Sequence, residues 1–293
     1  MRGQRTSLLA WVIGLLAAGQ VAAAAPETVY FPSADGSTEL VGYLYAPEGA
    51  GKHPAVVLLH GRSGLYTGRV NAGCTTVARG TASPCNAQTL SARHDSWGRY
   101  WADHGYLALL VDSYGPRDRA HGYGRKTHGD PARAAVHEAT VRPLDAEGGL
   151  AYLVQRPDVR ADRVMLQGWS NGGSTTLNVL HRQATGQAGA ARFRAALAFY
   201  PGCGKSALLA LTVRLDVPLW LLLASADEEV SPHVCRAMAE RADSTAGAPV
   251  VRWYDGASHG FDDPGKDRQA VASNRLARAD ALHAAARHFE ALP

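Results

Sequence analysis

Short apolar runs that alternate with helical segments are the feature that most constrains the fold of this sequence. A half-buried strand is expected at residues 38–45, and the later runs are typical of strands covered on both faces: 55–59, 107–111, 164–167, 195–200, 219–224 and 250–254. Helical patterns lie at 91–104, 131–155 (interrupted near Pro143), 175–184 and 271–289. This order predicts an α/β fold with a mostly parallel central sheet and helices on both faces.

Residues 1–24 are expected to be a secretory signal peptide. Arg2 and Arg5 precede an apolar stretch at 8–18, and an alanine-rich run offers a cleavage site. An uncleaved N-terminal anchor is the alternative. We expect residues 25–293 to form a single domain with one polar loop insertion at 66–90, because no linker or repeat interrupts the alternation. The mature protein is then periplasmic or secreted, with no stable membrane association after signal cleavage.

The charge distribution gives no indication of a nucleic-acid partner. The formal net charge of +4 includes Arg2 and Arg5 of the expected signal peptide. The remaining basic residues are scattered rather than clustered. We therefore expect no nucleic acid among the partners of this protein.

Residues 168–172 (GWSNG) place a serine between two glycines at the point where strand 164–167 ends. A sharp strand-to-helix turn strains its central residue and brings neighbouring backbones close, so small residues on either side relieve the crowding. This is the G-x-S-x-G nucleophile elbow, in the strand and helix context that the motif requires, although the same letters also occur in ordinary turns. The pattern predicts Ser170 as a nucleophile.

An acid and a histidine follow later strands in the order found in α/β-hydrolases. Asp227 follows strand 219–224, and His259 lies in a Gly-rich turn after strand 250–254. Functional residues of such sheets lie at the carboxyl ends of the strands, so we expect these side chains to meet Ser170 there. The imidazole would accept the serine proton and return it to the leaving group, and the carboxylate would fix the imidazole tautomer.

Other ionisable residues near strand ends are assigned structural roles. Glu228 and Glu229 are expected to be solvated or to cap the helix that begins near Ser231. Asp112 precedes the serine in the chain, which is the wrong order for the acid of this fold. His60 is expected to bond backbone within its own loop.

Two backbone amides are expected to bind the oxyanion of the reaction. One is the amide of Asn171, directly after the nucleophile. The second should come from the loop that follows strand 55–59, where Arg62 is the expected donor and Ser63 the fallback.

Four cysteines in an exported chain suggest two disulfides. Cys74 and Cys85 share the insertion, with no strand between them, and can close locally. Cys203 lies just beyond strand 195–200, and Cys235 begins the helix after the acid-bearing loop. Consecutive strands are usually neighbours, so the topology predicts the pairs Cys74–Cys85 and Cys203–Cys235.

Several segments together resemble the dienelactone hydrolase family of α/β-hydrolases: HGRSGL, DSYGPRD, GWSNGG, and SADEEVSP followed by SHGF. The resemblance covers nearly the whole mature chain apart from the insertion. It implies an α/β-hydrolase fold and a hydrolase of small-molecule esters or lactones that works without a cofactor or a metal.

The sequence departs from the family at positions that define the namesake enzymes. Those enzymes carry a cysteine nucleophile, a glutamate after the third strand and two arginines for the substrate carboxylate. Here Ser170 is the nucleophile, Gly61 stands in the glutamate's place and Asp263 stands where one arginine would be expected. Arg117 matches the other arginine and is a candidate for carboxylate binding, with a solvated loop arginine as the alternative. These departures argue against dienelactone itself as the substrate.

The leading functional hypothesis is an exported serine hydrolase that cleaves carboxylic esters or lactones through an acyl-enzyme. A second hypothesis retains the triad but assigns a different substrate bond to be cleaved, as in a polyester depolymerase or a peptidase on the same fold. A third is a non-catalytic binding protein, which the intact set of Ser170, Asp227 and His259 disfavours.

Overall fold

The computed structural model describes residues 25–125, 127 and 130–291, and the expected signal peptide lies outside them. An eight-stranded sheet forms the centre, in the order β1-β2-β4-β3-β5-β6-β8-β10. β1 pairs antiparallel with β2, and β2 with β4, while the other neighbours are parallel. The strands are β1 (Glu27–Pro32), β2 (Glu39–Tyr45), β3 (His53–Leu59), β4 (Leu107–Asp112), β5 (Val159–Trp169), β6 (Ala196–Phe199), β8 (Leu219–Ala224) and β10 (Val250–Tyr254). The short strands β7 (Arg214–Leu215) and β9 (Asp243–Ser244) pair separately.

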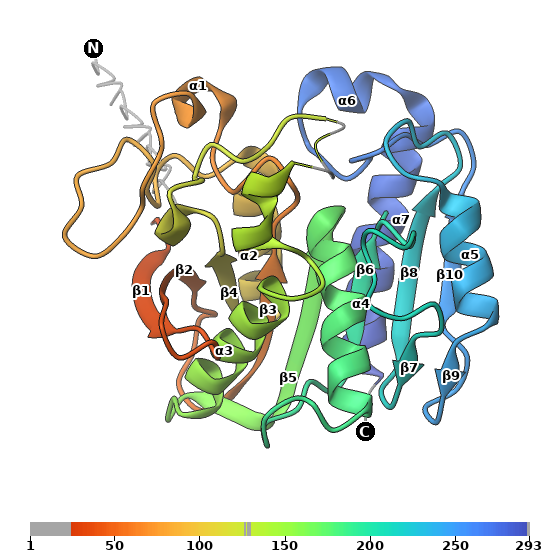
Figure 1. Ribbon diagram of the computed structural model, residues 1–293, viewed down its shortest axis with the longest axis horizontal. Coiled ribbons are helices and arrows are strands. Elements are labelled where there is room, and N and C mark those ends of the chain that lie inside the picture. Colours follow the sequence, from red (N-terminus) through yellow and green to blue (C-terminus); the bar gives the residue numbers. More distant parts are fainter. Residues whose placement is uncertain (1–24, 126, 128–129, 292–293) are drawn as a thin grey trace, which may run out of the picture.

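Helices cover both faces of this sheet (Figure 1). They are α1 (Gly68–Asn71), α2 (Ala92–Asp103), α3 (Arg142–Val154), α4 (Asn171–Ala184), α5 (Pro232–Glu240), α6 (Lys266–Ala270) and α7 (Ala272–Glu290), with 3₁₀ turns η1 (Gly115–Arg117) and η2 (Pro131–Val136). Successive strand residues point to opposite faces. Val57 and Leu59 therefore pack in a core with α3, α4 and α5, whereas Val56 and Leu58 pack in a second core with α2 and α7. Two cores explain why the strand sequences are continuously apolar.

The expected strands are all present, and the differences lie at exposed or short segments. β5 begins at Val159, earlier than expected, because the exposed residues 160–162 separate this buried valine from the apolar run and carry no apolar pattern themselves. β1, at the antiparallel edge, was not expected. The helix expected over 131–155 is divided into η2 and α3. Pro143 lies in the first turn of α3, where a proline favours the start of a helix.

The four cysteines lie in the two pairs that the topology predicted. Cys74 and Cys85 are joined within the insertion, with their Cα atoms 5.8 Å apart. Cys203 and Cys235 join the end of β6 to α5, with their Cα atoms 5.0 Å apart. Within the described residues, no helix is both long enough and apolar enough to cross a membrane.

Candidate active site

The turn after β5 holds its serine in a strained conformation. Ser170 has φ 53° and ψ −115°, a region that costs a non-glycine residue about 1–3 kcal/mol. Two backbone hydrogen bonds hold the turn: the Ser170 amide donates to Phe199 O over 2.9 Å, and the Ser174 amide donates to Ser170 O over 2.9 Å. The strain is therefore enforced from β6 on one side and from α4 on the other.

The two glycines of the motif are required by close backbone approach. A Cβ atom at Gly168 would lie 2.2 Å from Gly172 O, and one at Gly172 would lie 2.0 Å from Leu59 O. Both distances are far below van der Waals contact. Any larger residue would separate the elbow from β3, as expected from the sequence motif.

The acid and the histidine converge on this serine in the predicted order. His259 Nε2 lies 2.9 Å from Ser170 Oγ, and His259 Nδ1 lies 2.8 Å from Asp227 Oδ2. The Asp227 side chain is buried, and its Oδ1 accepts hydrogen bonds from the amides of Glu229 (2.8 Å) and Val230 (2.9 Å). Oδ2 is thereby directed at the imidazole, so that Nδ1 donates and Nε2 is free to accept from the serine hydroxyl.

A network of buried side chains packs against His259. The ring of Tyr200 lies 4.6 Å from that of His259, and its hydroxyl donates to Asp262. Asp262 also accepts a 2.8 Å hydrogen bond from Trp97 Nε1 on α2. Asp263, where the family pattern would place an arginine, instead pairs with Arg93 at 3.2 Å. These contacts fix the loop that carries the histidine.

The loop after β3 lies against the elbow, where the sequence placed the oxyanion donors. An added Cβ at Gly61 would be 3.5 Å from Ser170 Cβ, so the following residue, Arg62, is adjacent to the serine. The Asn171 amide is the first of α4 and has no intrahelical acceptor. Within the described part of the chain, the Arg62 amide has no acceptor either. Ser63, the fallback donor, is exposed.

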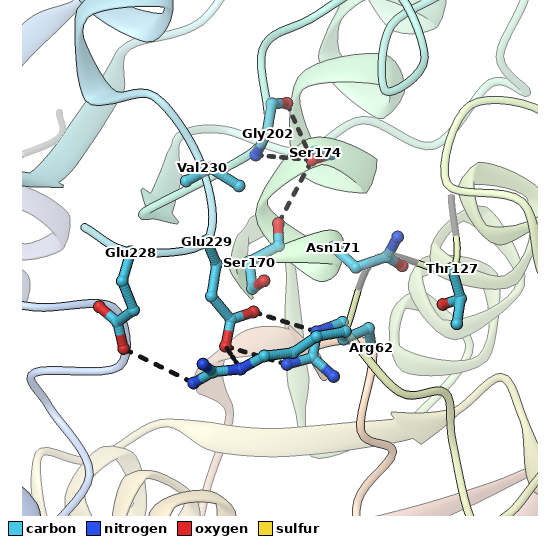
Figure 2. A pocket seen from close by; sticks show the side chains of 10 residues that line it. Arg62, Thr127, Ser170, Asn171, Ser174, Gly202, Glu228, Glu229 and Val230 are labelled. Carbon is cyan, nitrogen blue, oxygen red and sulfur yellow. Dashed lines mark hydrogen bonds and ion pairs between the residues drawn. The ribbon is translucent and has the colours of Figure 1, made fainter. Parts of the chain in front are cut away.

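A cavity of about 410 Å³ opens beside the serine (Figure 2). Four of its lining side chains are charged, namely Arg62, Arg125, Glu228 and Glu229, and the others are Thr127, Ser170, Asn171, Ser174, Gly202 and Val230. Its size is in the range of sites for small molecules. Among the described residues, no group of three or more His, Cys, Asp or Glu side chains could hold a metal ion.

The expectation that both glutamates are solvated or cap a helix is wrong for Glu229, whereas Glu228 is exposed as expected. Glu229 accepts two hydrogen bonds from Arg62 (3.0 and 2.9 Å), pairs with Arg125 at 3.0 Å, and lies 3.7 Å from His259 Nε2. Glu228 accepts a 2.9 Å hydrogen bond from the His259 amide. Burial opposes its ionisation, but this hydrogen bond and nearby cations lower its pKa below 4.5. Their place beside the acid was visible in the sequence, but their partners were not.

Arg117 is neither the substrate-binding arginine nor the solvated loop arginine that the sequence left as alternatives. Its guanidinium donates to both carboxylate oxygens of Asp145 on α3, at 2.9 and 2.8 Å, and to Asp35 at 3.1 Å. It does not line the cavity. A buried carboxylate carried by a helix neutralises this arginine, and the arginines at the cavity are Arg62 and Arg125.

Two other expectations from strand ends are confirmed. His60 Nδ1 bonds the carbonyl of Gly61 at 2.7 Å. Asp112 is buried and accepts hydrogen bonds from the amides of Tyr114 and Gly115 and from Tyr66 of the insertion, so its role is structural.

Several solved hydrolases are similar to this chain. A dienelactone hydrolase-like promiscuous phosphotriesterase from metagenomic libraries is 19% identical with a TM-score of 0.59, over 92% of this chain and 99% of that one. An esterase from Thermogutta terrifontis is 18% identical with a TM-score of 0.54, over 88% of this chain and 94% of its own. Dipeptidyl peptidase 4 from Porphyromonas gingivalis is 19% identical with a TM-score of 0.54, over 87% of this chain but 35% of its own.

These structural similarities concern the fold alone. The family is established by a comparison of sequences. A sequence model of the dienelactone hydrolase family matches residues 90–292, which is more than half of the chain. The mostly parallel sheet with helices on both faces is the α/β-hydrolase fold of that family. The chain therefore belongs to the dienelactone hydrolase family.

Proposed function

We propose that this protein is an exported serine hydrolase that cleaves carboxylic esters or lactones through an acyl-enzyme. The observation that carries the proposal is the continuous hydrogen-bonded chain from Asp227 through His259 to Ser170, at a strained elbow beside a cavity. A carboxylate, an imidazole and a hydroxyl in this geometry form the triad of serine hydrolases.

The roles of the three residues follow from their contacts. Ser170 Oγ attacks the ester carbonyl carbon as its proton passes to His259 Nε2, and the carbonyl oxygen becomes an oxyanion that the amides of Arg62 and Asn171 bind. His259 then gives that proton to the leaving alcohol oxygen as the C–O bond breaks, leaving the acyl group on the serine. Water then attacks the acyl carbon as its proton passes to His259 Nε2, and the bond between the acyl carbon and Ser170 Oγ breaks as that proton moves to Oγ, which releases the carboxylic acid.

The lining of the cavity favours a substrate whose acyl group is small and either uncharged or charge-balanced. Its charged side chains form pairs, since Glu229 faces both Arg62 and Arg125. Val230 and Gly202 supply apolar and small surface beside them. A substrate of this kind would leave the ion pairs intact.

A fluorophosphonate probe tests the nucleophile. Wild-type protein should be labelled and Ser170→Ala should not. Ser174→Ala is the matched control, because Ser174 lines the same cavity one helical turn away and should leave labelling intact. Absence of labelling of the folded wild type would support a binding protein instead. A panel of acyl esters, lactones, a polyester film and dipeptide anilides then separates ester hydrolysis from depolymerase or peptidase activity.

Export of the mature chain is supported by the two cysteine pairs, which require an oxidising compartment. N-terminal sequencing of protein recovered from the periplasm or the medium should begin near Ala25. Recovery of the chain only from the cytoplasm, with alkylatable thiols, would contradict export.

A further inference from the structure

Arg142, the first residue of α3, places a guanidinium in the interior behind the elbow. Its side chain has no exposed surface. Nη1 donates to Asn171 Oδ1, and Nη2 donates to His60 O over 2.8 Å. The group also lies 5.1 Å from the centre of the Tyr114 ring. One side chain thus joins two segments that are far apart in the sequence.

Unlike the other buried arginines, this arginine does not form an ion pair with a carboxylate. Arg117 faces Asp145, and Arg133 faces Glu138 at 3.3 Å. For Arg142, no carboxylate lies within ion-pair distance among the described residues, and its hydrogen-bond acceptors are neutral oxygens. Burial lowers the pKa of Arg142 below the usual value, because desolvation disfavours the charged form. The carboxylates of Asp145 and Glu138 oppose this effect from beyond ion-pair distance. A buried cation with no carboxylate in direct contact is costly.

The two acceptors of Arg142 belong to the segments that carry the proposed oxyanion amides. His60 O precedes Gly61 and Arg62, and the His60 ring is itself fixed by its bond to Gly61 O. Asn171 supplies the other amide and directly follows the nucleophile. Its Oδ1 also accepts from Tyr114 OH at 3.4 Å. Removing the guanidinium would therefore take a hydrogen-bond donor from both segments at once.

We propose that Arg142 is a positioning residue for the oxyanion hole: it holds the amides of Arg62 and Asn171 at a fixed separation, and its charge favours negative charge between them. This inference rests on the proposed hydrolase function. It assigns to α3 a part in the reaction that the triad alone does not require. Its effect acts through these two segments, because nothing places the guanidinium itself against substrate.

The test compares Arg142→Gln and Arg142→Lys with Arg133→Gln. Arg133 is an equally buried arginine, but it contacts neither oxyanion segment. The measurements are the free energy of unfolding, kcat and KM for a p-nitrophenyl ester, and Ki for a trifluoromethyl ketone, whose serine adduct carries an oxyanion. A loss of packing alone would lower stability in all three variants without changing the kinetics of folded protein.

We expect Arg142→Gln to lower kcat on the order of 10²-fold with KM nearly unchanged, and to weaken the ketone in proportion. Arg142→Lys keeps the charge but cannot span both acceptors, and should lie between wild type and Arg142→Gln. Arg133→Gln should retain wild-type kcat and Ki. If the Arg142 variants lost stability but kept wild-type kcat and Ki, the inference would be overturned and the hydrolase function would stand.

A double-mutant cycle tests the path of the effect. Asn171→Ala removes one acceptor of Arg142 but keeps the backbone amide. The losses in kcat from Asn171→Ala and Arg142→Gln should be clearly less than additive in the double variant. Full additivity would contradict action through Asn171. Failure of the wild type to hydrolyse any ester or to be labelled at Ser170 would instead overturn the proposed function, and this inference with it.

Discussion

Replacement of Asp227 by asparagine tests the triad sharply, because the structure dictates how the new amide must face. Asp227 Oδ1 accepts from the amides of Glu229 and Val230, and Oδ2 faces His259 Nδ1. Only the amide oxygen of an asparagine can accept those two hydrogen bonds, so its NH₂ group must face the imidazole. A donor there makes Nδ1 an acceptor and moves the ring proton to Nε2. That nitrogen can then no longer take the proton of Ser170.

We expect Asp227→Asn to lower kcat by about 10³- to 10⁴-fold, which corresponds to about 4–5.5 kcal/mol in the activation barrier. KM should change little, because the asparagine is isosteric and the cavity is intact. The assay is steady-state hydrolysis of a p-nitrophenyl ester, with unfolding curves as a check on folding.

Glu228→Gln is the matched control for this experiment. It removes a neighbouring carboxylate that accepts from the His259 amide, but it does not touch Nδ1. Its loss should stay below about tenfold, as for a nearby charge that is partly screened by solvent. If Asp227→Asn retained more than a tenth of kcat, or if Glu228→Gln lost as much as Asp227→Asn, the tautomer argument would be refuted.

Three further predictions concern stability and recognition. Replacing Cys203 and Cys235 by serine should lower the free energy of unfolding by about 3.7 kcal/mol, from the chain-entropy relation for a separation of 32 residues, as measured by urea denaturation. Arg117→Met should lower the free energy of unfolding by about 3–5 kcal/mol, because it leaves Asp145 buried and unpaired. KM for anionic and for neutral esters should nevertheless change alike. A rise in KM for anionic esters alone would restore a substrate-binding role. Burial lowers the pKa of His94 from 6.5 to about 3, so the stability that the neutral imidazole contributes is complete above pH 6.5 and is lost as the pH falls toward 3. His94→Gln should therefore reduce the dependence of the unfolding free energy on pH by up to about 1.4 kcal/mol per pH unit in this range, as measured by urea denaturation at a series of pH values. An unchanged pH dependence would contradict this prediction.

The backbone of the candidate site could be predicted from the sequence, because the ends of strands and close contacts between backbones each produce a recognisable local sequence pattern. Gly168 and Gly172 are dictated by contacts below 2.5 Å that exclude any Cβ, and such positions allow few residue types. Ser170, Asp227 and His259 each follow a strand of one parallel sheet, so their convergence required only the strand order. The cysteine pairing followed from the same topology.

The partners of charged side chains could not be predicted in this way. Arg117 and Arg142 both look like loop or helix-start arginines, and their roles depend on which group faces them across the fold. Asp145 lies on α3 and neutralises the first, whereas neutral oxygens of His60 and of Asn171 accept from the second. Glu229 was misjudged for the same reason, since its arginine partners come from the β3 loop and from residue 125. Long side chains reach partners that the sequence pattern does not specify.

The ion pairs that line the cavity lie directly beside the proposed reaction centre. Figure 2 shows the Glu229 carboxylate held between guanidinium groups beside Ser170, while the elbow and the acid depend on backbone contacts elsewhere. Neutralising Glu229 would remove the carboxylate that Arg62 contacts and leave Arg125 only its longer contact with Glu228 at 3.7 Å, and neutralising Arg125 would shift the potential the other way. Because Glu229 also lies 3.7 Å from His259 Nε2, a change of charge there would act on the imidazole as well as on a bound ester, so substrate preference and reactivity cannot be altered independently at this position.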